Sequence, residues 1–161
     1  MRWAFALIAT LMIAGVPAAM AAKKDLAKKD KDTKDYPRPA AIAKAGDKVI
    51  FKKENSVTHT YANGKTATFV PCDIGTNKDE IERGMILGRL ELTRNSKDGL
   101  EPGLYRVYIR KEGNHWQAFF CQDDKAVGKA DECQGGLEGE SKPHFMDAGT
   151  AIRYGWFKFS F

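Results

Sequence analysis

The side chains of this sequence with the widest chemical reactivity are its three cysteines. An odd number leaves at most one internal disulfide and at least one thiol. Cys121 and Cys133 are the predicted pair, because the polar, glycine-containing segment between them is short enough to be closed with a gain of about 3 kcal/mol. Cys72 bonded to either of them is the alternative, since spacing alone does not fix connectivity. The chain has no Cys-x-x-Cys spacing, so we predict no thiol-redox activity.

Histidine and methionine side chains raise a second possibility, a copper site. Such a site in an exported β-sandwich of cupredoxin type uses two histidines, one cysteine thiolate and often a methionine. His59, His144 and Met146 supply that set together with Cys121 or Cys133. The spacing is unlike that of cupredoxins, because Cys133 and His144 are too far apart for one tight loop, and a disulfide would remove the thiolate. We therefore predict no cofactor and no metal, and keep a cupredoxin-like copper protein as an alternative.

Serine chemistry is not indicated either. None of the four serines lies in a Gly-x-Ser-x-Gly turn, and each falls in a turn, a polar loop or the terminus. Adjacent acidic residues such as Asp123 and Asp124 point apart on a strand or loop, so they do not form an acid–base pair. We predict that the chain is not an enzyme.

Polar side chains on a predicted hairpin are the better candidates for function. Strands at 104–111 and 115–122 alternate apolar and polar residues, which gives the hairpin one buried face and one polar face. The polar face carries the candidate binding residues Arg106, Tyr108, Arg110, His115 and Gln117. The 121–133 loop is a second candidate contact, because binding residues often lie on loops held by a rigid scaffold.

The elements that must position these residues are strands. From residue 46 the apolar pattern has a period near two, with turn signals at intervals of about eight to twelve residues. We therefore predict an all-β domain over 46–161, a single antiparallel sandwich or small barrel of about seven or eight strands. Its helical content is one short helix near 78–83, which starts at an Asn77-x-x-Glu80 capping box. The other strands are expected at 48–52, 57–62, 65–70, 85–94 and 151–161.

The hairpin over 57–70 has the firmest register in the sequence. Asn63-Gly64 tolerates the positive φ angles of a two-residue turn, which places His59 opposite Thr68 and Val57 opposite Val70. The face shared by these residues is the predicted core face. At the other end of the chain, 151–161 is read as one strand with a bulge at Gly155. Its alternating aromatics resemble the last strand of a small outer-membrane β-barrel protein, which is another alternative.

The N-terminal residues predict export. Residues 1–21 have a basic start, an apolar run and small residues before Ala22, the pattern of a cleavable signal peptide. Residues 22–45 begin as a Lys/Asp-rich segment with little to bury, which predicts a disordered tether. The mature chain should therefore be periplasmic or secreted, with no integral membrane span.

The net charge of +5 must be divided by segment before it is used. Residues 40–161 hold 18 basic and 17 acidic side chains, so the domain is nearly neutral. No nucleic-acid partner is predicted. The expected function is that of an exported, non-enzymatic β-domain that binds an unknown protein, peptide or small ligand in the cell envelope.

Overall fold

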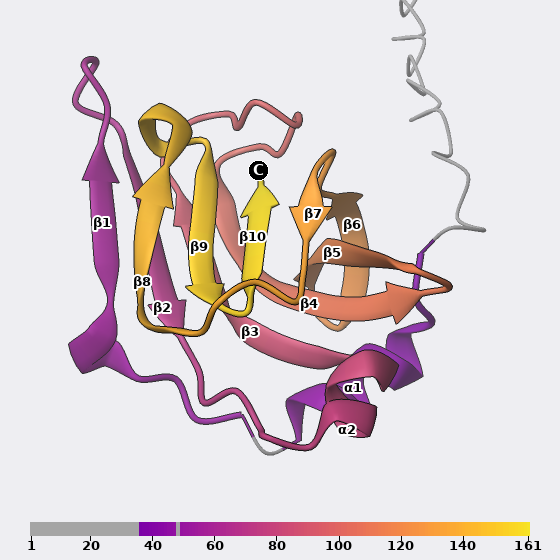
Figure 1. Cartoon of the computed structure of the whole chain (residues 1–161). Helices are drawn as coiled ribbons and strands as arrows, with labels where there is room; N and C mark the ends of the chain where they lie inside the picture. The colour runs from indigo at the N-terminus through magenta and orange to yellow at the C-terminus, as the bar shows by residue number, and fades with distance from the viewer. Residues whose placement is uncertain (1–35, 48) are drawn as a thin grey trace, which may run out of the picture. The chain divides into compact units, whose positions relative to one another are not determined.

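The computed structural model describes residues 36–47 and 49–161 of the chain. Within them, ten strands form two antiparallel sheets, one in the order β1-β2-β3-β4-β5-β6 and one in the order β7-β10-β9-β8 (Figure 1). The strands are β1 Val57–Thr60, β2 Thr66–Pro71, β3 Met85–Leu92, β4 Gly103–Glu112, β5 His115–Gln122, β6 Lys125–Lys129, β7 Cys133–Gln134, β8 Glu140–Met146, β9 Ala151–Gly155 and β10 Phe157–Ser160. The helices are α1 Pro39–Gly46 and α2 Lys78–Arg83, with single 3₁₀ turns at Lys53–Asn55 and Asp147–Gly149. The predicted all-β sandwich is confirmed.

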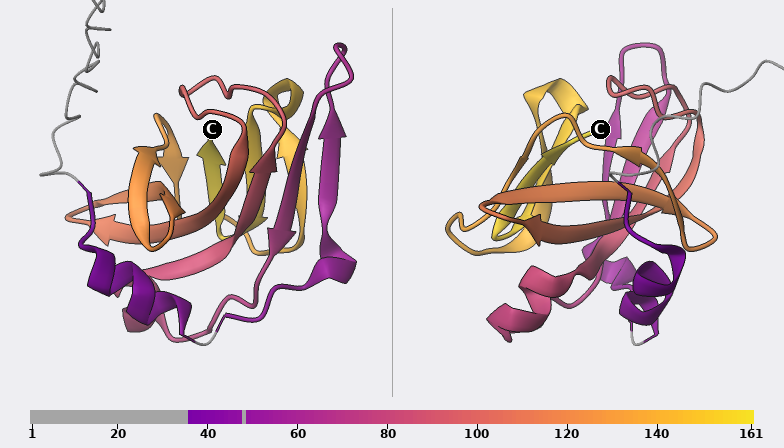
Figure 2. Two further views of the ribbon diagram at one scale, coloured as in Figure 1. Left: turned by 180° about the vertical axis from the view of Figure 1, so that it is seen from behind. Right: turned by 90° about the vertical axis from the view of Figure 1, so that its right-hand side faces the viewer.

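The four-stranded sheet covers one face of the six-stranded sheet (Figure 2). Apolar side chains from alternate positions of both sheets fill the space between them, as the period of two predicts. Strand β4 contributes Tyr105, Val107 and Ile109 to this inner core. Aromatic rings join the sheets, since Phe69 of the larger sheet has its ring centroid 6.0 Å from that of Phe159 of the smaller one.

The first hairpin differs from its predicted register by one residue. Gly64 has φ +74°, its amide donates to Tyr61 O, and Tyr61 N donates to Lys65 O, so the loop has three residues instead of two. His59 consequently faces Ala67, not Thr68. A shift of one residue exchanges the faces of a strand, and β2 therefore buries Ala67 and Phe69 instead of its threonines.

The ends of the predicted strand list also need correction. Of the strand predicted over 48–52, the described residues 49–52 form one isolated bridge, between Phe51 and Cys72, in place of a strand. Residues 151–161 form the β9–β10 hairpin, because Gly155 takes a positive φ of 56° and reverses the chain where a bulge was expected. Strands β6, β7 and β8 were not predicted, since their short polar sequences carry little apolar alternation.

Two short helices flank the large sheet. Helix α2 was predicted, and Asn77 caps it by accepting hydrogen bonds from the amides of Asp79 and Glu80 at 3.1 and 3.4 Å. Helix α1 was not, because residues 39–45 were assigned to the disordered tether. Pro39 starts this helix at a position where proline is tolerated, and Ile42 is fully buried. The ordered domain therefore begins before residue 46, while the predicted signal peptide and most of the tether lie outside the described residues.

No helix in the described ranges is long and apolar enough to cross a membrane.

Candidate functional site

The outer face of the β4–β5 hairpin holds the five predicted binding residues together. Cross-strand pairing sets Tyr108 opposite Phe119, Arg110 opposite Gln117, and Glu112 opposite His115. Side chains at these alternating positions share the face that points away from the four-stranded sheet. The predicted grouping of Arg106, Tyr108, Arg110, His115 and Gln117 on one surface therefore agrees with the register of the hairpin.

Helix α1 lies across the middle of this outer face. Ile42 of the helix packs with Tyr108 and Phe119 in a second apolar cluster, and Tyr36 meets the Phe119 ring edge-on at 6.1 Å. Tyr108 is consequently buried, and this burial raises the pKa of its hydroxyl. The predicted contact role of Tyr108 is not supported, because its side chain is covered. His115 stays exposed at the hairpin end.

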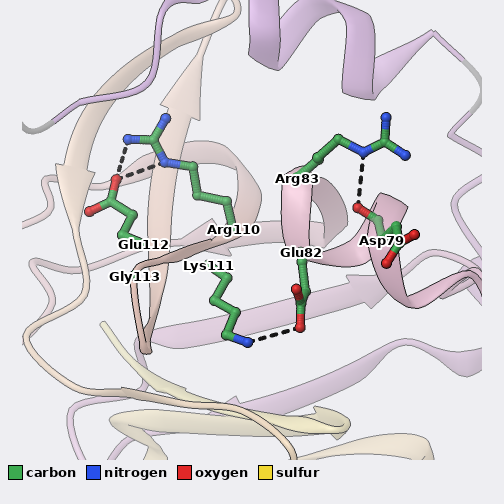
Figure 3. Close-up of a pocket in the computed structure, with 7 residues that line it drawn as sticks. All are labelled: Asp79, Glu82, Arg83, Arg110, Lys111, Glu112 and Gly113. Atoms are coloured by element: carbon green, nitrogen blue, oxygen red, sulfur yellow. Dashed lines mark hydrogen bonds and ion pairs between the residues drawn. The ribbon is translucent and has the colours of Figure 1, made fainter.

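Two hollows lie near opposite ends of the β4–β5 hairpin. The first hollow, about 700 Å³ in volume, lies between α2 and the end of the β4–β5 hairpin (Figure 3). Its walls carry acidic and basic side chains in equal number, Asp79, Glu82 and Glu112 against Arg83, Arg110 and Lys111. It contains the predicted residue Arg110.

Most charges of the first hollow are paired within it. Lys111 Nζ lies 2.9 Å from Glu82 Oε1, and Arg110 Nε donates to Glu112 Oε1 at 2.7 Å. The hydrogen bond from Lys111 lowers the pKa of the Glu82 carboxyl. Arg83 Nε donates to the backbone oxygen of Asp79 at 3.0 Å, so this side chain is also held to its own helix (Figure 3). The arrangement ties α2 to strand β4.

The second hollow, about 530 Å³, opens where strands β3, β4 and β5 meet the segment that follows α1. Apolar and charged side chains line it together: Phe51, Arg89, Leu104, Arg106, Cys121 and Asp123. Leu104 is 48% exposed, which makes it one of three large hydrophobic side chains of the described residues that face solvent. The hollow contains the predicted residue Arg106.

Two arginines face each other in the second hollow. Arg89 of β3 and Arg106 of β4 are register partners on neighbouring strands, and like charges directly opposite one another are destabilising. Arg106 Nη1 is paired with Asp124 at 2.5 Å. Arg89 forms none of the ion pairs found in the described part of the chain, and its guanidinium carbon lies 5.4 Å from the centroid of the Phe51 ring. The second hollow thus holds a cation without a partner carboxylate.

The cysteines do not form the predicted disulfide. All three are free, and they lie in different places: Cys121 in the outer cluster beneath α1, together with Cys72, and Cys133 against the core between the sheets. Because alternate residues of β5 point to opposite faces, Cys121 points away from the side on which Cys133 packs. Burial raises the pKa of each thiol to about 12, so all three are poor nucleophiles.

The residues of the copper alternative are not brought together. His59 packs on the inner side, 4.7 Å from the Tyr61 ring and 5.7 Å from the Phe145 ring between centroids. His144 and Met146 flank Phe145 on β8 and therefore point the other way. No group of three or more histidine, cysteine or acidic side chains suited to hold a metal ion occurs in 36–47 and 49–161. A cupredoxin-like site is not supported by this geometry.

A scan against protein-family models and searches of curated proteins and of solved structures found no match to this chain.

Sequence reasoning missed Arg89, Phe51 and Leu104. Arg89 was within reach, because it is out of phase with the buried Leu90 and Leu92 and so had to lie on the outer face. Its position opposite Arg106 needed the pairing of β3 with β4. Phe51 is positioned by an isolated bridge, which the apolar periodicity of the sequence does not predict.

Proposed function

We propose that this chain is an exported, non-enzymatic binding domain whose partner in the cell envelope docks on the outer face of the six-stranded sheet. The observation that carries the proposal is the second hollow, in which an exposed leucine, Leu104, adjoins the two opposed arginines, Arg89 and Arg106. A partner with an apolar part and an acidic part is complementary to this combination. The partner class is a protein, a peptide or a small ligand.

The side chains with nucleophilic potential support a role without covalent catalysis. A catalytic thiol needs a lowered pKa, whereas burial raises the pKa of Cys72, Cys121 and Cys133 to about 12. Ser160 is buried, and its hydroxyl donates to Asp98 at 2.6 Å, an interaction that holds the last strand to the β3–β4 loop. The cysteines pack in apolar clusters, and the Ser160 hydroxyl is engaged in its hydrogen bond.

The free thiols also fit an exported protein. An oxidising compartment selects for cysteines that are either paired or inaccessible, since the thiolate is the form that oxidises. Cys72 and Cys121 are buried, Cys133 is partly buried, and burial raises the pKa of each thiol to about 12. The signal-like sequence of residues 1–21 supports the same location.

Site-specific photo-crosslinking tests this proposal. A photoreactive amino acid replaces Leu104 in the full-length chain, and the exported fraction of the source organism is irradiated. We expect one dominant adduct at this position, and we expect Arg106→Glu to remove it, because reversing a charge inside a docking surface repels the partner. The matched control carries the same amino acid at Asn95, which is exposed on the β3–β4 loop. Equal adducts at both positions, or none at position 104, would contradict the proposal.

A further inference from the structure

We infer that the second hollow recognises a carboxylate that is carried next to an apolar side chain, as in an acidic segment of a partner protein. This inference rests on the proposed function and names the chemistry of its ligand. The carboxylate would lie against Arg89 and Arg106, and the neighbouring apolar side chain would lie on Leu104 and Phe51.

Only one of the two opposed arginines of the hollow has a carboxylate in ion-pair contact. Arg106 already has a carboxylate partner in Asp124, at 2.5 Å. Arg89 has none within ion-pair distance among residues 36–47 and 49–161, although it faces Arg106 across the strands. A carboxylate placed between the two guanidinium groups would pair with Arg89 and offset the repulsion. Arginine suits this role because its planar fork donates two parallel hydrogen bonds to a carboxylate.

The surrounding acidic residues limit the charge of the ligand. Asp123 lines the hollow, and Glu91 lies two residues from Arg89 on the same face of β3. These carboxylates would repel a phosphate dianion or a polyanion more strongly than a single carboxylate. The near neutrality of residues 40–161 likewise offers no long-range attraction for nucleic acid. A monoanionic side chain fits these surroundings best.

The apolar part of the site sets the second requirement. Leu104 is 48% exposed, and Phe51 presents its ring to the hollow beneath the Arg89 guanidinium. Covering this surface would favour binding, because it removes apolar area from water. A peptide with a glutamate beside a leucine satisfies the charge requirement and the apolar requirement together.

NMR titration of the mature domain with short capped peptides tests the inference. The probes are acetyl-Leu-Glu-Leu-amide, its Leu-Gln-Leu counterpart and its Leu-phosphoserine-Leu counterpart. We expect the glutamate peptide to shift the amides of Leu104 and Arg106 and to bind about tenfold more tightly than the glutamine peptide, because a charged hydrogen bond is lost in the latter. The phosphoserine peptide should bind more weakly than the glutamate peptide.

Two variants make the result specific to the hollow. Arg89→Gln should weaken glutamate-peptide binding about tenfold, whereas the matched change Arg83→Gln in the first hollow should leave it unchanged. Leu104→Ser, at an exposed position, should weaken both uncharged and charged peptides. Unshifted amides far from the hollow verify that each variant is folded.

Three results would overturn the inference: equal affinity for the glutamate and glutamine peptides, peptide-induced shifts confined to the first hollow, or unchanged affinity of the folded Arg89→Gln variant. Failure here is distinguishable from failure of the proposed function. An adduct specific to position 104 that persists while peptides bind without regard to charge would leave the binding domain standing and remove its carboxylate preference.

Discussion

The two hollows near opposite ends of the β4–β5 hairpin both contain arginines and differ in how these arginines are paired. In the first hollow, Lys111 is paired with Glu82, and Arg110 with Glu112. In the second, Arg89 faces Arg106 and has no carboxylate within ion-pair distance in the described residues. A ligand of the first hollow must compete with the ion pairs of Arg110 and Lys111 and with the hydrogen bond of Arg83 to the backbone oxygen of Asp79, whereas Arg89 in the second hollow has no ion pair to give up. Two cavities of similar size on one surface can therefore have different roles.

The apolar content of the hollows differs in the same direction. Charged side chains and a glycine line the first hollow, while Phe51 and the half-exposed Leu104 belong to the second. Ion pairs near the surface contribute modestly to stability, and here they hold a short helix to a strand. We interpret the first hollow as a structural junction and the second as the contact surface.

The largest predicted effect concerns Cys121, which lies at the second hollow and has no counterpart in the first. With its pKa raised to about 12 by burial, its thiolate fraction near neutral pH is roughly a thousandfold below that of an exposed cysteine. A thiol reagent such as DTNB should react at least that much more slowly with the folded domain than with an Asn95→Cys control. In guanidinium chloride all three native cysteines should react. A single reactive thiol there would instead indicate the disulfide that the sequence suggested.

Truncating a buried side chain of helix α1 should have the next largest effect, a loss of folding stability. Ile42 is fully buried against the sheet, and its truncation in Ile42→Ala should lower the free energy of unfolding by about 3 kcal/mol. Urea unfolding followed by tryptophan fluorescence measures this change. Lys44→Ala on the exposed side of α1 is the control and should stay within about 0.5 kcal/mol of the wild type. A loss below about 1 kcal/mol for Ile42→Ala would mean that burial of Ile42 does not anchor α1 to the sheet.

Removing one carboxylate from the first hollow should allow it to bind the acidic peptide, as the second hollow is proposed to do. Glu112→Gln leaves Arg110 without its carboxylate partner, so the first hollow should acquire affinity for the Leu-Glu-Leu peptide, about threefold above background. NMR shifts at Lys111 and Gly113 would report this binding. Glu54→Gln, outside both hollows, should have no such effect. If Glu112→Gln produced no peptide-dependent shifts, an unpaired arginine would not be sufficient to create a binding surface.

The smallest expected effect is the pH dependence of the folding stability that Glu82 contributes in the first hollow. The folded pKa of Glu82 is depressed by the hydrogen bond from Lys111, so its contribution to stability is present above the ordinary value of 4.5 and is lost as the pH falls through the folded pKa. The urea midpoint should therefore fall more in the wild type than in Glu82→Gln between about pH 6 and about pH 3. This difference in urea midpoint should shrink in about 0.5 M salt, because salt at that concentration screens exposed charges. Equal pH profiles at low salt would show that this pair adds nothing to stability.

The sequence predicted the parts of this fold that depend on local pattern. Period-two alternation identified the buried faces of β4 and β5, and the Asn77 capping box located α2, because both signals arise from neighbouring residues. The same alternation placed Arg106 and Arg110 on the outer face. These candidates therefore needed no knowledge of the sheet order.

What the sequence missed depends on tertiary contacts. Helix α1 is short and begins after a Lys/Asp-rich segment, and its stability comes from the burial of Ile42, which only the assembled sheet provides. The 57–70 register depended on whether Asn63-Gly64 formed a two-residue or a three-residue loop, and the three-residue loop exchanged the faces. The meeting of Arg89 with Arg106 likewise required the register of the consecutive strands β3 and β4, which the long loop between them does not set.

The most direct test of the difference between the hollows is a pair of double-mutant cycles on the free energy of unfolding at low salt. One cycle combines Arg89→Gln with Arg106→Gln in the second hollow, and the other combines Arg110→Gln with Glu112→Gln in the first. A cycle isolates the interaction of its two side chains from their other contacts, including that of Arg89 with Phe51. We expect a repulsive coupling of about 0.5 kcal/mol in the second hollow and an attractive one of similar size in the first. A zero or attractive coupling between Arg89 and Arg106 would contradict the account, because the two arginines would then not repel each other and a bound carboxylate would have no repulsion to offset.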